Sequence, residues 1–285
     1  MALNTVINTN VMALTAHRNL GAVGNRQQKA NQKLSSGKKI NSAADDAAGL
    51  AISDKMKSQI RGLDMATKNA EDGVSLIQTT EGAMTEITNM MQRIRELAVQ
   101  GANGTNTAED RDKLKEEVGK LYDEITATST RTQFNKQNLL TGRLSEGINL
   151  AIGANGGQNI IVSLQSANMN AESLFSLAKA DFLASMSNAW SDGSTVSILS
   201  NIDTALGKVA KQRAKLGAYQ NTLDYTINSL KNTRENLSAA NARIEDTDMA
   251  KEMMELTQAN VLQQAATSML AQANQAPNSI TQLLG

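Results

Sequence analysis

The sequence contains no cysteine, one histidine and one proline, and its aromatic residues are three Phe, three Tyr and one Trp. The absence of cysteine excludes a disulfide scaffold, a thiolate metal site and a cysteine nucleophile. A single histidine, His17, excludes a His-rich metal site and most His-based acid–base catalysis. So few aromatic residues also argue against a large globular core. The apolar residues are mostly Ala, Leu, Ile, Val and Met, which favour helices.

Charge and hydropathy exclude further classes. The chain carries 28 basic and 28 acidic side chains, so no net field attracts nucleic acid. No run approaches the roughly 18 apolar residues of a membrane span. The first basic side chain is Arg18, and Asn and Thr interrupt the apolar residues before it, so we expect no cleaved secretory signal. A cytoplasmic location and export by a route that reads an uncleaved N-terminus both stay open.

Helical periodicity is the main pattern in the sequence. Alternating steps of four and three from Ile52 to Ala98 meet mostly apolar residues, which is a seven-residue repeat typical of a coiled-coil-like seam. A helix over 45–100 would be roughly 85 Å long at 1.5 Å per residue. The turn at 101–106 and a second stripe over 108–131 predict a helical hairpin.

The remaining elements follow from changes of period. Apolar residues alternate over 148–152 and 160–164 around a Gly-rich turn, which predicts one small β-hairpin. Residues 171–194 indicate a short helix and an irregular return. Helical spacing resumes over 202–244, and a final helix is expected over 246–275 with Pro277 as its end. The fold class is therefore mainly α, a long antiparallel coiled-coil-like rod.

The two chain ends are alike, with modest apolar stripes in Asn- and Gln-rich helices. Such stripes stabilise a helix only weakly unless they are packed. The ends either pair within a monomeric bundle or stay loose until other subunits cover them. The periodicity alone leaves both possibilities open.

Several long stretches at the two sides of the chain match one known family. At the N-terminal side these are Leu34–Ile52, Gln78–Ala83 and Gln92–Gln100, and at the C-terminal side Arg243–Ala250 and Leu262–Gln275. Together they resemble the signatures of bacterial flagellin. The resemblance covers roughly residues 1–142 and 195–285. The span between is too short for the outer globular domains of larger members, so the chain resembles a minimal flagellin.

The resemblance implies a paired-terminus rod. It divides the chain into an inner-core helix (1–42), rod helices (43–142), a hairpin with an irregular return (143–194), a rod helix (195–244) and a second inner-core helix (245–285). It implies a structural, non-enzymatic subunit of the extracellular flagellar filament, without catalytic residues, metal or cofactor. The residues expected at the polymerisation core are Leu3, Ile7, Val11, Leu14, Met253, Leu256, Leu262, Met269 and Leu270.

The partners implied by the resemblance are further copies of the chain, the filament cap and the hook-associated proteins. Nucleic acid and membrane are not expected. Export would use the flagellar type III apparatus, with a flagellar chaperone on about Met249–Gly285. Toll-like receptor 5 would recognise the monomer. The matching receptor-contact residues are Gln92, Arg93, Leu97, Gln100 and Glu117, and Arg93 and Leu97 are expected on one exposed helix face.

Simpler interpretations cover the other candidate sites. His17 is expected to be solvated or structural, and Asp45-Asp46 to cap a helix because adjacent residues face different sides. Ser42 and Asp45 have the spacing of a capping pair. Two other functions remain as alternatives. A hook–filament junction protein shares similar termini, and a signalling coiled coil would share the heptads.

Overall fold

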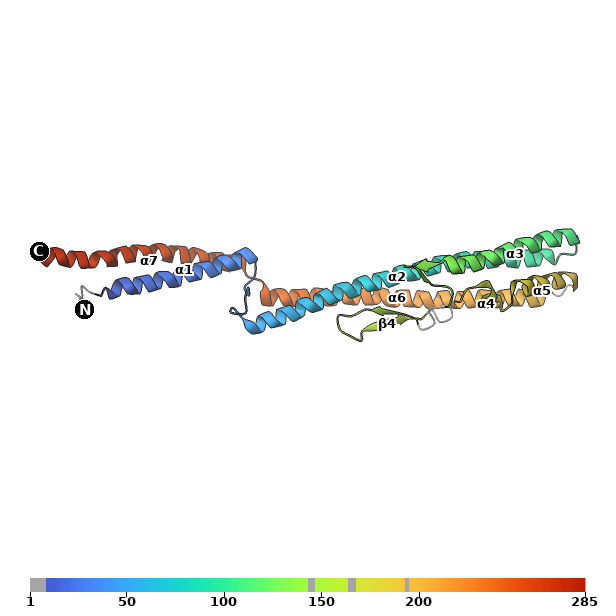
Figure 1. Ribbon diagram of the computed structural model, residues 1–285, viewed down its shortest axis with the longest axis horizontal. Coiled ribbons are helices and arrows are strands. Elements are labelled where there is room, and N and C mark those ends of the chain that lie inside the picture. Colours follow the sequence, from blue (N-terminus) through green and yellow to red (C-terminus); the bar gives the residue numbers. More distant parts are fainter. Residues whose placement is uncertain (1–8, 143–146, 164–167, 193–194, 285) are drawn as a thin grey trace. The chain divides into compact units, whose positions relative to one another are not determined.

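The computed structural model describes residues 9–142, 147–163, 168–192 and 195–284 (Figure 1). Leu3 and Ile7 lie outside these ranges. The chain divides into two units, one formed by residues 1–58 with 236–285 and the other by residues 59–235. The five segments expected from the resemblance, with bounds at residues 42 and 245 among them, stay a prediction.

Helices dominate both units. The helices are α1 (Val11–Ser36), α2 (Ala47–Gly101), α3 (Ala108–Arg131), α4 (Ala171–Phe175), α5 (Lys179–Asp192), α6 (Val196–Glu245) and α7 (Met249–Leu284). The strands are β1 (Gln133–Phe134), β2 (Gln137–Asn138), β3 (Ile148–Ala151) and β4 (Asn159–Val162). The mainly helical fold and the helix expected over 108–131 are confirmed.

The first unit is built on the antiparallel pair α1 and α7 (Figure 1). Three contacts fix its register. Asn10 Nδ2 donates to the Ala273 carbonyl at 2.6 Å, Gln27 Nε2 donates to Asn260 Oδ1 at 2.7 Å, and Lys33 Nζ lies 3.4 Å from Glu252 Oε1. The expectation that the two chain ends pair is therefore confirmed.

The expected end of α7 at Pro277 is wrong, because the helix continues to Leu284. A proline inside a helix removes one N–H and leaves the carbonyl four residues earlier without its helical donor. That carbonyl belongs to Ala273, and it accepts the hydrogen bond from Asn10 Nδ2. The partner helix thus supplies the donor that proline lacks.

The second unit holds the coiled-coil-like seam. The heptad positions of α2 from Leu63 to Ala98 are buried, whereas Ile52 at the start of the pattern is 47% exposed. Helix α6 runs antiparallel to α2 there, since Asp64 pairs with Arg234 at 2.8 Å and Arg95 with Asp203 at 3.0 Å. The predicted long helices therefore pack along their apolar stripes.

The predicted β-hairpin is confirmed as β3 and β4, with Ile148 opposite Val162. It packs on α2 where glycine permits close approach. A Cβ on Gly73 would lie 2.4 Å from Leu150 Cδ1, too short for a non-bonded contact. Asn69 Nδ2 also donates to the Ala151 carbonyl at 2.9 Å. Leu164, expected in the second strand, lies outside the described residues.

A second two-stranded sheet, β1 with β2, was not predicted. Its turn residues Asn135 and Lys136 both have positive φ, as a two-residue hairpin turn requires. Asparagine tolerates this conformation, but lysine rarely adopts it. The pair Asn135-Lys136 therefore lacks the glycine that usually marks such a turn in a sequence. Residues 171–194 also contain two helices, α4 and α5, where one was expected.

The start of α2 differs from the expected capping pair. The Asp45 carboxylate accepts hydrogen bonds from Asn41 N, Ser42 N and Ser42 Oγ, which closes a turn ahead of the helix. These bonds, chiefly from the two backbone N–H groups, lower the pKa of Asp45. The cap itself is Asp46, whose Oδ1 accepts from Gly49 N at 2.9 Å. The Asp45-Asp46 pair thus has a structural role, as expected.

Candidate assembly surface

The contact between α1 and α7 is lined mainly by small or polar side chains. On each helix these less exposed positions follow steps of three and four. They are Ala13, Ala16, Leu20, Val23, Gln27, Ala30 and Leu34 on α1, and Glu252, Leu256, Ala259, Gln263, Ala266, Leu270 and Ala273 on α7. Alanine buries little area, so this seam holds the pair together only modestly.

Large apolar side chains instead point outward from the pair. They are Val11, Met12, Leu14, Met249, Met253, Met254, Val261, Leu262 and Met269, each between 41% and 67% exposed. Covering the exposed half of one such side chain contributes roughly 1 kcal/mol. The first unit therefore leaves more large apolar surface outside its own seam than within it.

Three hollows interrupt this surface. One of about 380 Å³ is lined by Val11, Met12, Ala16 and Met269 among others, and one of about 450 Å³ by Met253, Met254 and Val261 with two polar neighbours. The third, of about 400 Å³, is charged as well as apolar. Each could receive side chains of another molecule.

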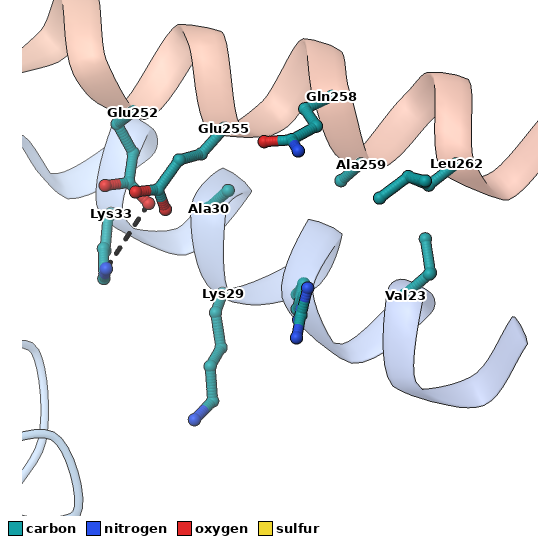
Figure 2. Close-up of a pocket in the computed structure, with 10 residues that line it drawn as sticks. Val23, Lys29, Ala30, Lys33, Glu252, Glu255, Gln258, Ala259 and Leu262 are labelled. Carbon is teal, nitrogen blue, oxygen red and sulfur yellow. Dashed lines mark ion pairs between the residues drawn. The ribbon is translucent and has the colours of Figure 1, made fainter. Parts of the chain in front are cut away.

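The charged hollow lies between Val23, Lys29 and Lys33 on α1 and Glu252 and Leu262 on α7 (Figure 2). Lys33 forms an ion pair with Glu252 across it, whereas Lys29 points away from α7 (Figure 2). Among the labelled residues of this hollow, the unpaired Lys29 and the apolar Leu262 are thus both accessible.

The residues expected at the polymerisation core fall into two groups. Leu256 and Leu270 lie in the α1–α7 seam. Val11, Leu14, Met253, Leu262 and Met269 lie on the outer apolar surface. Their role in polymerisation stays a prediction, but the two groups must differ, because seam residues hold one subunit together and outer residues face its surroundings.

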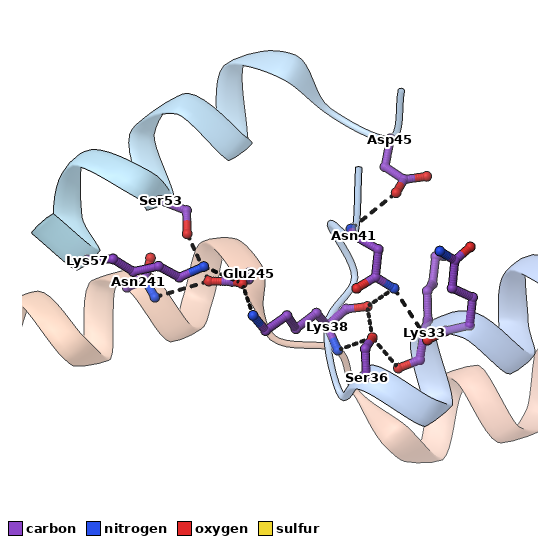
Figure 3. Close-up of polar contacts among 10 residues, drawn as sticks. Lys33, Ser36, Lys38, Asn41, Asp45, Ser53, Lys57, Asn241 and Glu245 are labelled. Atoms are coloured by element: carbon purple, nitrogen blue, oxygen red, sulfur yellow. Dashed lines mark hydrogen bonds and ion pairs between the residues drawn. The ribbon is translucent and has the colours of Figure 1, made fainter. Parts of the chain in front are cut away.

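A cluster around the buried Glu245 carboxylate was missed from the sequence (Figure 3). Lys38 Nζ and Lys57 Nζ each lie 2.6 Å from Glu245 Oε1, and Ser53 Oγ donates to Oε2 at 2.8 Å. Asn241 Nδ2 donates to Oε2 at 3.3 Å. We call these five residues the Glu245 cluster. Their separation in sequence, up to 207 positions, explains why no local pattern marks them.

Two opposing effects set the pKa of Glu245. Burial raises it, but the hydrogen bonds from Lys38, Lys57, Ser53 and Asn241 together outweigh burial and lower the pKa to about 2. Hydrogen bonding to Glu245 also raises the pKa of Lys38. The carboxylate is therefore ionised at neutral pH despite being 3% exposed.

Backbone bonds extend the Glu245 cluster. Lys39 N donates to the Glu245 carbonyl at 2.7 Å, and Thr247 N donates to the Gly37 carbonyl at 3.0 Å. The segment after α1 is thus fastened to the end of α6, while Ser53 and Lys57 fasten the start of α2 to the same carboxylate. The cluster fixes how the α1–α7 pair leaves these two helices.

The receptor-contact residues expected from the resemblance lie in the second unit. Arg93 Nη2 is 2.9 Å from Glu117 Oε1, and Arg93 Nη1 is 3.2 Å from Glu96 Oε2. Hydrogen bonding, first to Glu117 and then to Glu96, raises the pKa of Arg93. Gln92 and Gln100 are exposed and Glu117 is half-buried. Four of the five side chains are therefore accessible.

Leu97 is the exception. Its side chain is fully buried in the core of the second unit, so the expectation that it shares an exposed face with Arg93 is wrong. The two residues are one turn apart, but Leu97 packs in the core beside the seam positions Ile94 and Ala98, whereas Arg93 lies outside it. Within the folded subunit, Leu97 supports this surface from beneath.

The other candidates are structural. His17 is exposed, and the part of the chain that the structure describes contains no group of His, Cys, Asp or Glu able to hold a metal ion. Among the described helices, none combines the length and the apolar content needed to cross a membrane.

Comparison with known proteins agrees with this architecture. The family model for the bacterial flagellin N-terminal helical region matches residues 7–145, and that for the C-terminal helical region matches residues 199–284. A flagellin from Halalkalibacterium halodurans is 48% identical, and one from Bacillus subtilis is 45% identical. Each alignment covers 98% of this chain and 99% of the relative.

A solved flagellar hook-associated protein from Vibrio parahaemolyticus has a TM-score of 0.57 over 71% of this chain and all of its own. At 14% identity it shows a shared fold alone. The family matches at both ends and the near-complete alignments carry the assignment. The chain belongs to the bacterial flagellin family, the family of flagellar filament subunits.

Proposed function

We propose that the chain polymerises into the extracellular flagellar filament through the outer apolar surface of its α1–α7 pair. The observation that carries this proposal is the inverted distribution of side chains. Small residues such as Ala30, Ala259 and Ala273 are buried in the pair, while Leu14 and Met269 are more than half exposed. A stable monomeric bundle would have the large residues inside.

The second unit supplies the contrast. All of the largest fully buried side chains of the described residues lie there, including Met84, Ile94 and Phe182. That unit buries its largest apolar side chains within itself, whereas the α1–α7 pair leaves nine large apolar side chains 41–67% exposed. Other copies of the chain fit, because a heterologous contact that does not close produces a helical filament.

Electron microscopy of seeded assembly tests the proposal with a matched pair of variants. Leu14 on α1 is 57% exposed and Ile161 on β4 is 56% exposed. Leu14→Glu should fold but fail to form filaments, because a charge would be buried at the contact. Ile161→Glu changes the same exposed area in the other unit and should assemble.

Deletion of residues 249–285 adds a second test. The shortened chain should keep the helical second unit, seen by circular dichroism, and form no filaments. Filaments from this chain or from Leu14→Glu, with the same yield as from the full chain, would refute assembly through the α1–α7 pair.

Export and capping form the second part of the proposal. The flagellar type III apparatus exports the chain, a flagellar chaperone holds about Met249–Gly285 before export, and the filament cap and hook-associated proteins meet the chain at the filament ends. The exposed apolar surface of α7 supports the chaperone part, since such a surface requires cover before assembly. A pull-down with the flagellar chaperone as bait tests this part: the full chain should be retained, and the chain lacking residues 249–285 should not.

We also propose that Toll-like receptor 5 recognises the monomer around Arg93. The accessible guanidinium, paired with Glu117 and flanked by Gln92 and Gln100, offers hydrogen-bond donors for an interface, and arginine is a frequent anchor. Arg93→Ala should reduce receptor signalling at least about tenfold. Arg61→Ala, an exposed arginine on the same helix, is the control.

A substitution at Leu97 would affect receptor signalling by a different mechanism from one at Arg93. Since its side chain is buried, Leu97→Ala would act by leaving a cavity beneath the surface, and a cavity lowers stability as well as signalling. Loss of signalling in Leu97→Ala without any loss of stability would show that the side chain contacts the receptor directly. Unchanged signalling in Arg93→Ala would refute the proposed site.

A further inference from the structure

Most methionines of the described residues are either fully buried or about half exposed, and only Met56 and Met90 lie between. In the second unit, Met84, Met91, Met169 and Met186 are fully buried. Six methionines of the described residues are about half exposed or more, and five of these belong to the α1–α7 pair. The five are Met12, Met249, Met253, Met254 and Met269, between 48% and 67% exposed. The sixth, Met65, lies on α2.

Four of the five exposed methionines of the pair also line its hollows. Met253 and Met254 line one hollow on α7 with Val261, and Met12 and Met269 line another with Val11. The hollows are open to solvent, so a small polar reagent reaches the thioether sulfurs directly. Neither hollow has a charged side chain in its lining, and an apolar side chain of another subunit seated there would offer a sulfoxide no hydrogen-bond donor.

We propose that these five methionines are a peroxide-sensitive modification site that controls whether a free subunit can assemble. The proposal rests on the assembly function proposed above. The oxidant is hydrogen peroxide or another small hydroperoxide, and the product is methionine sulfoxide. Subunits already in a filament are protected, because the contact covers the same side chains.

The chemistry requires no catalytic residue. A sulfur lone pair attacks one peroxide oxygen, a sulfur–oxygen bond forms and the oxygen–oxygen bond breaks. The leaving hydroxide takes the proton of the transferred hydroxyl and becomes water. Sulfur is oxidised by two electrons and the peroxide is reduced.

The consequence follows from polarity. A sulfoxide is a polar hydrogen-bond acceptor, and burying it in an apolar contact without a donor is unfavourable. The α1–α7 seam itself contains none of the five sulfurs, because Ala, Leu, Val, Gln and Glu occupy its positions. Oxidation therefore leaves the subunit folded and removes its ability to join others.

The experiment begins with mapping. The full-length monomer is treated with hydrogen peroxide, and sulfoxides are located by peptide mass spectrometry. Methionines of the α1–α7 pair should oxidise at least about ten times faster than Met84, Met91, Met169 and Met186. Equal rates at exposed and buried methionines would overturn the modification site, and this readout does not depend on assembly.

Assembly is then measured by seeded light scattering and electron microscopy. The treated full chain should keep its helical circular dichroism and lose at least about nine-tenths of its filament yield. The protected variant carries Met12→Leu, Met249→Leu, Met253→Leu, Met254→Leu and Met269→Leu, since leucine has similar volume and resists peroxide. It should assemble equally with and without treatment.

Met65→Leu is the matched control, because Met65 is 55% exposed in the other unit. It should remain as peroxide-sensitive as the original chain. Protection by Met65→Leu alone, or full filament yield from mapped, oxidised chain, would overturn the proposal. If the five-leucine variant fails to assemble untreated, Met253→Leu with Met254→Leu serves instead and should give partial protection.

Failure of the assembly proposal can be distinguished from failure of the oxidation proposal. If the assembly proposal is wrong, the chain forms no filaments on seeds either before or after peroxide treatment. The sulfoxide map still decides whether the α1–α7 methionines are the modification site. Loss of yield only after treatment, with the untreated chain assembling, attributes the effect to oxidation.

Discussion

Replacing Glu245 by glutamine should destabilise the first unit in a pH-dependent manner. The substitution keeps the shape of the side chain but removes the charge that Lys38 and Lys57 share at 2.6 Å. Both ammonium groups then lose their counter-ion. The helix connection that the Glu245 cluster fixes should loosen as a result.

The magnitude follows from the pKa of Glu245. A decrease from 4.5 to about 2 corresponds to roughly 3 kcal/mol at about 1.4 kcal/mol per pKa unit. Lys38 and Lys57 are 44% and 32% exposed, and solvent screens their attraction, so we expect about 1–2 kcal/mol at pH 7. The folded state favours the ionised form, so this stabilisation is complete above pH 4.5 and declines as the pH falls toward 2.

The assay is peptide-resolved hydrogen exchange with urea unfolding at pH 2.5, 4 and 7. Exchange is needed because the two units can unfold separately, and a single transition would average them. The difference between the original chain and Glu245→Gln should be largest at pH 7 and fall to about a quarter of that value at pH 2.5, since the folded pKa of Glu245 is about 2. Glu235→Gln, at an exposed position of the same helix, should show little difference at any pH.

Two results would refute this reasoning. A difference of the same size at pH 2.5 and pH 7 would show that the charge of Glu245 is not the source of stability. Faster exchange in peptides of the second unit alone would show that the cluster does not act where the structure locates it.

Two further predictions concern backbone packing. Gly101→Ala should destabilise the second unit by about 1–3 kcal/mol, since its Cβ would lie 2.2 Å from the Trp190 ring, whereas Gly82→Ala should stabilise it by about 0.5–1 kcal/mol because nothing lies within 4 Å. Thermal unfolding measures both, and equal signs would contradict the packing argument. Asn10→Ala should lower the free energy of unfolding by about 1 kcal/mol more in the original chain than in a chain that already carries Pro277→Ala. The reason is that only proline leaves the Ala273 carbonyl without a helical donor, which Asn10 then supplies. A double-mutant cycle with no coupling would contradict it.

Periodicity predicted the long helices because their apolar spacing is a local property of the sequence. The seam from Leu63 to Ala98 could be located without any knowledge of its partner. The same rule extended the seam to Ile52, where it was wrong, because burial depends on which elements arrive from elsewhere. Spacing identifies a face and does not identify what covers it.

The errors at Pro277 and Leu97 have the same origin. The local rule for proline is correct about the missing N–H, but Asn10 on another helix compensates for it. The one-turn spacing from Arg93 placed Leu97 on an exposed face, but its side chain packs in the core of the second unit. The Glu245 cluster was invisible for a related reason, since its members come from three separate parts of the chain.

The division between the two units connects these observations with assembly. In the second unit, residues as large as Ile94 and Phe182 are fully buried, so that unit needs no partner to hide them. Among the described residues of the first unit, Ile40 is the one large apolar side chain that is nearly fully buried, and the other buried apolar positions are alanines. A seam in which alanine is the commonest residue can separate at modest cost, and the outer methionines and leucines gain more from contact with other chains than from contact with each other. The placement of small residues inside the α1–α7 pair and large apolar residues outside it therefore lowers the stability of the free subunit and favours its association with other subunits. A substitution that replaced a buried alanine of the seam by a larger apolar residue would be expected to stabilise the monomer and to reduce assembly.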